Sequence, residues 1–205
     1  LVTAIAVVGG VLAVGTMRLG APESGRPFRV AVLQGNFSQD AKWRPGMREA
    51  IVERYERLTH EAGQAGPRLI VWPETALPFP VRQDDAVRRR VEQLARQVNA
   101  NLVVGSPDIG SSVPPRYFNS ALYVTPDGGI AAKYDKIHLV PFGEYVPLRS
   151  VLGFVDKLVQ GAIGDFTPGR VYSVFALGAA RFGVTISYEV YFPSQVRRYV
   201  QGGAG

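Results

Sequence analysis

The sequence predicts a mixed α/β domain in which strands and helices alternate, and three observations support this. Short apolar runs rich in β-branched residues alternate with longer segments whose apolar residues recur at helical spacing. The tetrapeptide PDGG at 126–129 has the turn chemistry of a hairpin. Finally, 46% of the 205 residues are hydrophobic, which suits the core of one domain and not of two large ones.

The first half of the domain has the pattern of a β-α-β-α-β run. Strands are predicted over 28–34 (FRVAVLQ), 68–74 (RLIVWPE) and 101–107 (NLVVGSP). Helices are predicted over 47–65 and around 87–98, where apolar residues fall three or four positions apart.

The second half of the domain begins with the hairpin. YFNSALYVT (117–125) and GIAAKY (129–134) flank the PDGG turn and predict its two strands. Two further strands are predicted near 171–176 and 181–186, followed by a helix near 194–200.

The N-terminal residues predict a membrane-spanning segment. No charge occurs before Arg18, and a bilayer core requires about 20 apolar residues, with a lower limit near 17. We therefore interpret residues 1–20 as the end of a transmembrane helix, residues 21–27 as a linker and residues 28–205 as the globular domain. A buried strand or helix of a larger core is the alternative for the first segment. Because the chain opens on Leu1 without an initiator Met, we expect it to be a fragment.

Composition excludes several kinds of site. The chain has no cysteine, which rules out disulfides and thiolate metal sites, and its two histidines, His60 and His138, give little support to a metal site or a Ser-His-Asp triad. The net charge of +6 suits anionic partners only weakly. No basic stretch is interleaved with aromatic residues, so we expect no nucleic acid partner. Because cysteine is absent and only two histidines occur, we also expect no metal.

Glu74 is the first candidate for chemistry. It follows an apolar strand and a proline, so its carboxylate is expected at the carboxyl end of a strand, where burial against Trp72 would raise its pKa toward that of a general base. An acid near a helix N-terminus is the structural alternative, and it is the commoner role for a single glutamate of this kind.

The second candidate segment is KYDKIHLVPFGEYVP at 133–147, a polar loop broken by two prolines and a glycine. Lys136 would supply a fixed positive charge for a developing oxyanion, and Glu144 a carboxylate that orients it. Solvated loop charges are the alternative for both. His138, flanked by Ile137 and Leu139, favours a hydrogen-bonded packing role.

Ser187 is the third candidate, because the alternating strand in GVTISYEVYFP (183–193) stops at this small hydroxyl and is followed by Tyr188 and Glu189. Strand ends at the carboxyl edge of an α/β sheet often carry the chemistry. A nucleophile and a plain turn are both consistent with this pattern.

Taken together, VWPETALPF, YDKIHLVPFGEYVP, DFTPG and GVTISYEVYFP resemble, in this order, the motifs of the carbon-nitrogen hydrolase (nitrilase) superfamily. With LQGNFSQDAKW, which ends at Trp43, and an apolar helix ahead, they are most similar to the apolipoprotein N-acyltransferase family of bacterial inner membranes. The resemblance covers residues 28–205 and implies a nitrilase-like four-layer α-β-β-α sandwich, preceded by the end of a transmembrane helix.

The resemblance also implies roles for individual positions. The implied catalytic residues are Glu74 as general base, Lys136 as oxyanion-stabilising residue, Glu144 as supporting acid and Ser187 as nucleophile. The implied substrate-binding residues are Trp43, near the acyl-binding region, and Tyr188 and Glu189, which shape the site.

The implied reaction moves an acyl group from a phospholipid donor to the nucleophile, and then to the N-terminal amine of diacylglyceryl-cysteine in an apolipoprotein acceptor. It requires no cofactor. The implied location is the bacterial inner membrane, with the catalytic domain on the periplasmic side, and we expect a monomer.

Two departures from the family pattern are present. The family nucleophile is cysteine, and replacing a thiol of pKa about 8.5 by a hydroxyl near 15.7 raises the cost of deprotonation by roughly 10 kcal/mol. Ser187 therefore suggests an inactive or weakened form. The chain also ends at Gly205 before the family's last strands and loop, so we expect the domain to be C-terminally incomplete. A soluble amidase and a catalytically dead binding module of the same fold remain as alternatives.

Overall fold

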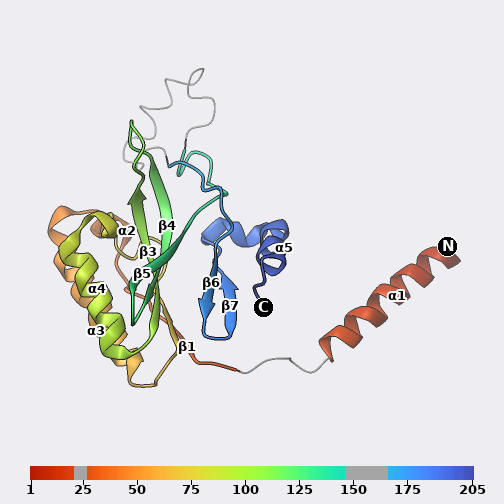
Figure 1. Ribbon diagram of the computed structural model, residues 1–205. Coiled ribbons are helices and arrows are strands. Elements are labelled where there is room, and N and C mark those ends of the chain that lie inside the picture. Colours follow the sequence, from red (N-terminus) through yellow and green to blue (C-terminus); the bar gives the residue numbers. More distant parts are fainter. Residues whose placement is uncertain (21–26, 146–165) are drawn as a thin grey trace, which may run out of the picture.

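The computed structural model describes residues 1–20, 27–145 and 166–205 (Figure 1). Most of the predicted linker, the end of the loop at 146–147 and Asp165 of the DFTPG motif lie outside the described residues. The described chain confirms an α/β fold and places every predicted strand and helix at its expected place in the order of elements.

The central layer is a five-stranded mixed sheet in the order β1-β2-β3-β4-β5. Its strands are β1 (Val30–Val32), β2 (Leu69–Val71), β3 (Asn101–Ile109), β4 (Tyr117–Thr125) and β5 (Gly129–Asp135). The first three strands are parallel, because helical crossovers join them, whereas the hairpins at the other edge pair antiparallel.

Two helices, α3 (Arg48–Gly63) and α4 (Asp85–Val98), cover one face of this sheet. The Asp84 side chain caps α4 by accepting hydrogen bonds from the backbone N–H groups of Ala86 and Val87, both at 3.1 Å. Since strand side chains alternate between faces, Leu102 and Val104 of β3 point into this helix-covered core, while Val103 points to the other side.

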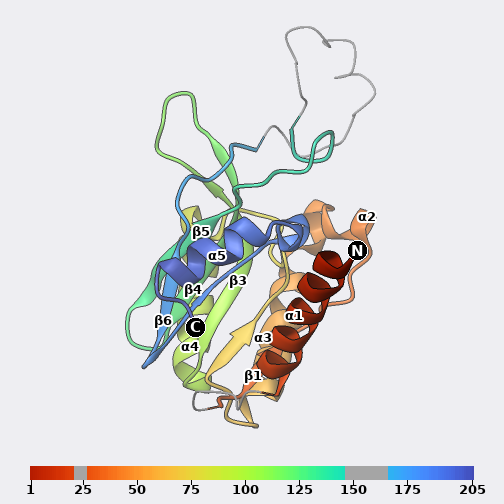
Figure 2. The same cartoon turned by 90° about the vertical axis from the view of Figure 1, so that its right-hand side faces the viewer.

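The opposite face of the sheet packs on a second, two-stranded antiparallel sheet of β6 (Val174–Leu177) and β7 (Ala180–Gly183), with α5 (Pro193–Gln201) outside it. Tyr123 of β4 stacks on Phe175 of β6 with ring centroids 5.0 Å apart. The order of layers is therefore α-β-β-α (Figure 1). Figure 2 shows α5 running across the strands on the side away from α3 and α4.

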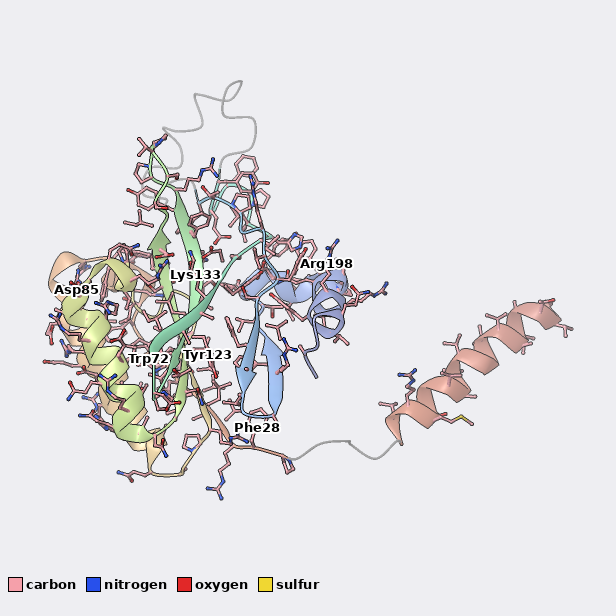
Figure 3. The ribbon with its side chains drawn as sticks, in the orientation of Figure 1. Phe28, Trp72, Asp85, Tyr123, Lys133 and Arg198 are labelled. Atoms are coloured by element: carbon pink, nitrogen blue, oxygen red, sulfur yellow. The ribbon has the colours of Figure 1, made fainter. Side chains whose placement is uncertain are left out.

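Side chains fill both interfaces of the central sheet (Figure 3). Trp72 lies in the core under the helices, where its ring stacks on Tyr55 at 4.8 Å and its indole N–H donates to Thr59 at 3.0 Å. Tyr123 lies in the other core, toward β6. Because helices cover one face of the sheet and strands the other, β3 is buried along nearly its whole length.

Short elements surround one end of the sheet. They are α2 (Gln39–Lys42), the 3-10 helices η1 (Pro45–Met47) and η2 (Val81–Gln83), and the 3-10 helix η4 (Ser187–Tyr191). Strand β7 ends at Gly183, three residues earlier than the sequence predicted, and the chain then continues without strand pairing as far as Ser187.

Helix α1 (Val2–Leu19) has 18 residues, a mean hydropathy of 1.8 and no buried side chain. By length and composition alone it is able to cross a membrane. It confirms the expected helix, and its role in a membrane stays a prediction.

Candidate active site

Glu74 lies in the turn that follows β2, beside the middle of β3. The Trp72 N–H bonds the Val103 carbonyl at 2.8 Å, after which the chain turns sharply over Gly105. A Cβ atom at position 105 would lie 2.7 Å from Thr75 N and 2.9 Å from Glu74 Cα, so only glycine lets the turn approach β3 this closely. The carboxyl end of β2 thus positions the predicted base.

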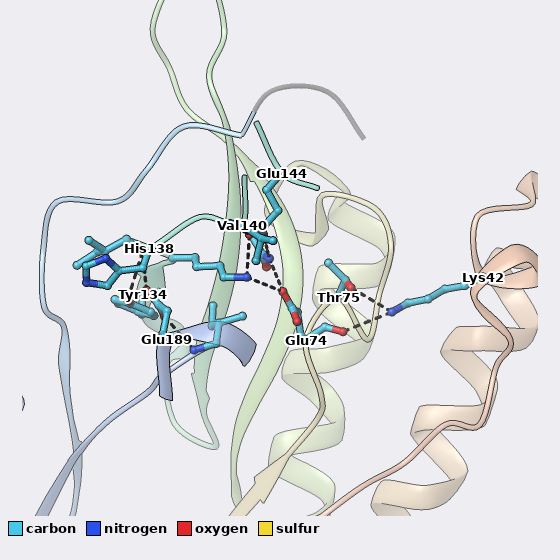
Figure 4. A network of polar contacts seen from close by, with 12 residues as sticks. Lys42, Glu74, Thr75, Tyr134, His138, Val140, Glu144 and Glu189 are labelled. Carbon is cyan, nitrogen blue, oxygen red and sulfur yellow. Dashed lines mark hydrogen bonds and ion pairs between the residues drawn. The ribbon is translucent and has the colours of Figure 1, made fainter. Parts of the chain in front are cut away.

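Lys136 follows β5 directly, and its side chain reaches Glu74 in this turn. Figure 4 shows Glu74 and Glu144 within this network of polar contacts. Its side chain is 1% exposed, and its Nζ lies 3.2 Å from Glu74 Oε1 and 2.9 Å from Glu144 Oε2. The backbone N–H of Lys136 donates to the Asn119 carbonyl at 2.8 Å, which fixes the start of the side chain. A buried ammonium between two carboxylates is a stationary positive charge.

Glu144 lies in a turn eight residues after Lys136. Its Oε2 accepts a hydrogen bond from the Val140 N–H at 2.8 Å in addition to the contact with Lys136. The structure therefore brings Glu74, Lys136 and Glu144 together from three separate segments, as the sequence motifs predicted.

Asn119 of β4 completes the cluster, and the sequence analysis missed it. Its Nδ2 donates to Glu74 Oε1 at 2.7 Å and to Glu144 Oε1 at 2.8 Å, so a closed ring of contacts joins the amide, the two carboxylates and Lys136. Asn119 is 3% exposed. A polar residue within the apolar strand YFNSALYVT was the available signal.

The ring uses only one oxygen of Glu74. Glu74 Oε1 accepts from both Asn119 and Lys136, and among the described residues no hydrogen bond engages Oε2. The Glu74 side chain is 35% exposed. One carboxylate oxygen is thus positioned while the other is available to take a proton from an incoming group.

Ser187 begins η4 and lies on the surface of the domain. Its φ of 51° falls in the left-handed region, which is costly for a residue with a side chain and is common where a tight turn presents a functional group. Among the described residues, no hydrogen bond joins Ser187 to Glu74, Lys136 or Glu144.

Glu189 fixes the turn that carries Ser187. Its carboxylate is fully buried and accepts hydrogen bonds from two backbone N–H groups just after Lys136, those of Ile137 at 2.8 Å and His138 at 3.0 Å. It also accepts from the Ile186 N–H at 2.9 Å. The Ser187 turn is therefore held against the residues that follow Lys136, and the Glu189 side chain faces the protein interior.

Tyr134 supplies the remaining donor to Glu189, with its hydroxyl 2.6 Å from Oε1. Burial and the hydrogen bond to Glu189 hold the pKa of Tyr134 well above its ordinary value. The phenol thus remains a hydrogen-bond donor at every physiological pH.

Tyr188 lines a cavity of about 540 Å³ that lies between the residues just after Lys136, such as Ile137, and the turn that begins at Ser187. Its walls are mainly apolar and aromatic, with Leu139, Phe166 and Phe192 among them. His138 lines it too and stacks on Phe192 at 4.0 Å, which agrees with the expected packing role, although its Nε2 is buried without a hydrogen-bond partner among the described residues.

Trp43 lies at the end of α2, and the structure places it in a different pocket from Tyr188. This second pocket has a volume of about 240 Å³, and Pro78 and Phe79 form part of its wall. No group of three or more His, Asp or Glu side chains in the described part of the chain is arranged to hold a metal ion.

Comparisons with known proteins point to one family. The family model of carbon-nitrogen hydrolases matches residues 29–205. The apolipoprotein N-acyltransferase of Geobacter metallireducens is 45% identical over 195 residues, covering 94% of this chain and 37% of that protein. The enzyme of the same name from Allorhizobium ampelinum is 38% identical, with 94% and 38% covered. The chain thus spans well under half the length of these relatives.

Solved structures support the fold. An amidase from Nesterenkonia sp. matches with a TM-score of 0.63 at 24% identity, over 90% of this chain and 65% of that one. A carbon-nitrogen hydrolase from Helicobacter pylori G27 matches with a TM-score of 0.62 at 20% identity, over 86% and 57%. These similarities establish the α-β-β-α architecture.

Proposed function

Because the chain belongs to the carbon-nitrogen hydrolase family, we propose that it carries the catalytic site of an apolipoprotein N-acyltransferase. The observation that supports this most directly is the ring of contacts that joins Glu74, Lys136 and Glu144. It combines a base with a free oxygen and a buried cation, which acyl transfer through a covalent intermediate requires. The name of two relatives, apolipoprotein N-acyltransferase, supports acyl transfer to an apolipoprotein, and a phospholipid donor is part of the proposal.

In the proposed first half-reaction, the Ser187 hydroxyl attacks the ester carbonyl of a phospholipid while Glu74 Oε2 takes its proton. The carbonyl oxygen becomes an oxyanion beside the Lys136 ammonium. When the tetrahedral intermediate collapses, the lysophospholipid alkoxide leaves and recovers the proton from Glu74.

In the second half-reaction, the N-terminal amine of the acceptor's diacylglyceryl-cysteine attacks the acyl-enzyme. Glu74 takes a proton from the amine and returns it to the Ser187 oxygen as the amide forms. The charges of Lys136 and Glu144 do not change during the cycle. The proposed chemistry therefore needs no metal and no organic cofactor.

Serine at position 187 weakens this chemistry. A hydroxyl is about seven pKa units less acidic than a thiol, so a carboxylate base deprotonates it far less readily. We expect the serine form to react slowly or not at all. This same residue favours the second candidate, a catalytically dead module that keeps the fold and binds lipid or lipoprotein without turnover.

The location follows from the same proposal. Helix α1 would lie in the bacterial inner membrane, and the α-β-β-α domain would work on the periplasmic side as a monomer. Trp43 and Tyr188, which line two different pockets, would contact the lipid substrates. A soluble amidase, in which water replaces the amine, would not need the exposed apolar helix.

The Ser187→Cys variant of the full-length protein tests the proposal. Incubated with phospholipid, this variant should gain the mass of one acyl group as a thioester, and a diacylglyceryl-cysteine peptide should discharge it. The matched control is the Ser187→Cys, Glu74→Gln double variant, which should gain no acyl group. If the single variant gains none either, position 187 is not the nucleophile.

A further inference from the structure

The pocket that contains Trp43 is cationic. Its lining consists of Lys42, Trp43, Arg44, Arg48, Pro78 and Phe79, and it includes no acidic side chain. Three cationic side chains therefore border a space of about 240 Å³ between the end of α2, the start of α3 and the loop after Glu74. Because Asp84 pairs with Arg48, the excess positive charge comes from Lys42 and Arg44. Such a concentration of one sign attracts an anion.

Lys42 reaches the turn of Glu74 and Thr75 from the side away from Tyr134 and His138 (Figure 4). Within the described part of the chain its Nζ donates to two neutral oxygens, the Thr75 hydroxyl at 3.0 Å and the Glu74 carbonyl at 3.4 Å. Burial lowers the pKa of Lys42, and the charge of Glu74 offsets this only in part. No carboxylate of the described residues forms a direct ion pair with this ammonium, and an anion in the pocket would form one.

The two arginines differ in how they are held. Arg48 forms an ion pair with Asp84 and lies over the Phe79 ring, 4.0 Å from its centroid. Arg44 is exposed and makes no ion pair with any described residue. One guanidinium is thus part of the wall, and the other is available to an incoming ligand as a bidentate donor.

We propose that the pocket formed by Lys42, Trp43, Arg44 and Phe79 binds the phosphodiester group of a glycerophospholipid. The inference deepens the proposed function, on which it rests, because it assigns the subsite for the headgroup of the acyl donor. In a glycerophospholipid the phosphate and the reacting acyl ester are attached to the same three-carbon glycerol. Lys42 bonds the backbone of Glu74 itself, so a phosphate held there keeps the ester close to the base.

The aromatic walls suit the same ligand. Trp43 and Phe79 present apolar surface beside the cations, which is the combination found where side chains meet the headgroup region of a bilayer. A free phosphate ion would use the cations alone, whereas the glycerol and headgroup of a phosphodiester would also contact these rings.

Binding is tested without any acyl transfer, by following Trp43 fluorescence in the full-length protein. The only other tryptophan in this chain, Trp72, is 2% exposed and held in the core. The titrants are glycerophosphoethanolamine, inorganic phosphate, and an equimolar mixture of glycerol and ethanolamine. We expect glycerophosphoethanolamine to bind most tightly, inorganic phosphate more weakly, and the uncharged glycerol with ethanolamine not at all.

Arg44→Gln and Lys42→Gln should each weaken glycerophosphoethanolamine binding roughly tenfold, since each removes one charge-assisted hydrogen bond. The matched control is Arg57→Gln, which removes the same charge from an exposed position on α3 and should leave binding unchanged. Equal affinity for inorganic phosphate, or equal loss in the control, would overturn the proposal.

Kinetics in the Ser187→Cys background separate this inference from the proposed function. Arg44→Gln should raise KM for phosphatidylethanolamine roughly tenfold while leaving acyl transfer from diacylglycerol, which has no phosphate, unchanged. If glycerophosphoethanolamine binds but no thioester forms, the Trp43 pocket is a phosphodiester site and the proposed acyltransferase function is wrong. If the thioester forms and Arg44→Gln affects both donors alike, the subsite is wrong.

Discussion

The carboxylate of Glu189 accepts a hydrogen bond from the backbone N–H of Ile137 at 2.8 Å, and this contact joins the turn of Ser187 to the residue that follows Lys136. The backbone N–H of His138 donates to the same Glu189 oxygen at 3.0 Å. Glu189 and His138 are 51 positions apart in the sequence, so these contacts hold the Ser187 turn and the residues after Lys136 in one arrangement. Glu189 is fully buried, so its role is to position the turn.

Glu189→Gln should therefore destabilise the domain. The new amide group would place a donor opposite groups that are themselves donors, which we expect to cost about 2–4 kcal/mol. Thermal unfolding measures the loss. The control is Glu61→Gln on the surface of α3, where the side chain is 61% exposed and little change in Tm is expected. An unchanged Tm in the Glu189 variant would show that the buried contacts do not hold the turn.

Substitutions of Asn119 should slow acyl-enzyme formation more than they weaken substrate binding. In the Ser187→Cys background, Asn119→Ala removes the amide that bridges Glu74 and Glu144, and we expect the rate to fall about 100-fold with KM for phospholipid nearly unchanged. Asn119→Asp should be slower still, because a third carboxylate would face the other two.

The neighbouring residue provides the control for Asn119. Ser120 lies on the same strand and is buried, but its hydroxyl bonds Asp135 at 2.6 Å and does not reach the site. Ser120→Ala should therefore keep the rate of acyl-enzyme formation. If Asn119→Ala and Ser120→Ala slow the reaction equally, the effect comes from the strand and not from the bridge.

Gly105→Ala should displace the turn that carries Glu74. The added methyl would overlap the Pro73 carbonyl and approach Glu74 Cα to 2.9 Å, a steric conflict that we expect to cost about 1–3 kcal/mol. Acyl-enzyme formation should fall as well, because the base moves away from Lys136. Gly128→Ala is the matched control, since its Cβ would meet only the Thr125 hydroxyl at 3.5 Å. Normal activity in Gly105→Ala would refute the close approach.

Asp108 should give the domain a pH-dependent stability. Burial alone would raise the pKa of its fully buried carboxylate, but hydrogen bonds from Lys133 and Gln83 and the nearby charges of Lys133 and Arg82 hold the pKa below its ordinary 3.8. A lowered pKa stabilises the folded state above the unfolded value, and this stabilisation disappears as the pH falls below about 4.

Asp108→Asn tests that contribution by urea unfolding at several pH values. At pH 7 the variant should lose about 2–3 kcal/mol of unfolding free energy, and its stability should fall less steeply than that of the original protein below pH 4. Asp127→Asn, an exposed change that keeps the chemistry of the hairpin turn, should leave the curve unchanged. Parallel curves for the Asp108 variant and the original protein would contradict the assignment.

The order of strands and helices was predictable because it depends on local patterns. The short, β-branched apolar run in 101–107 identifies a strand whatever it packs against, and the helical spacing around 87–98 identifies α4 in the same way. The end of β7 was predicted three residues too late, since backbone pairing with β6 stops at Gly183 while the apolar alternation continues to Ile186. Pairing partners are not encoded in a local pattern.

The sequence alone determined the α/β class, the apolar first helix and three of the residues that meet in the site, Glu74, Lys136 and Glu144. Only the tertiary structure decided that Asn119 bridges the two carboxylates, that Glu189 faces the interior and that Trp43 and Tyr188 line separate pockets. The physical reason is distance along the chain. Lys136 and Glu74 are 62 positions apart in the sequence, so their contact depends on the sheet, which brings the ends of β2 and β5 to the same place.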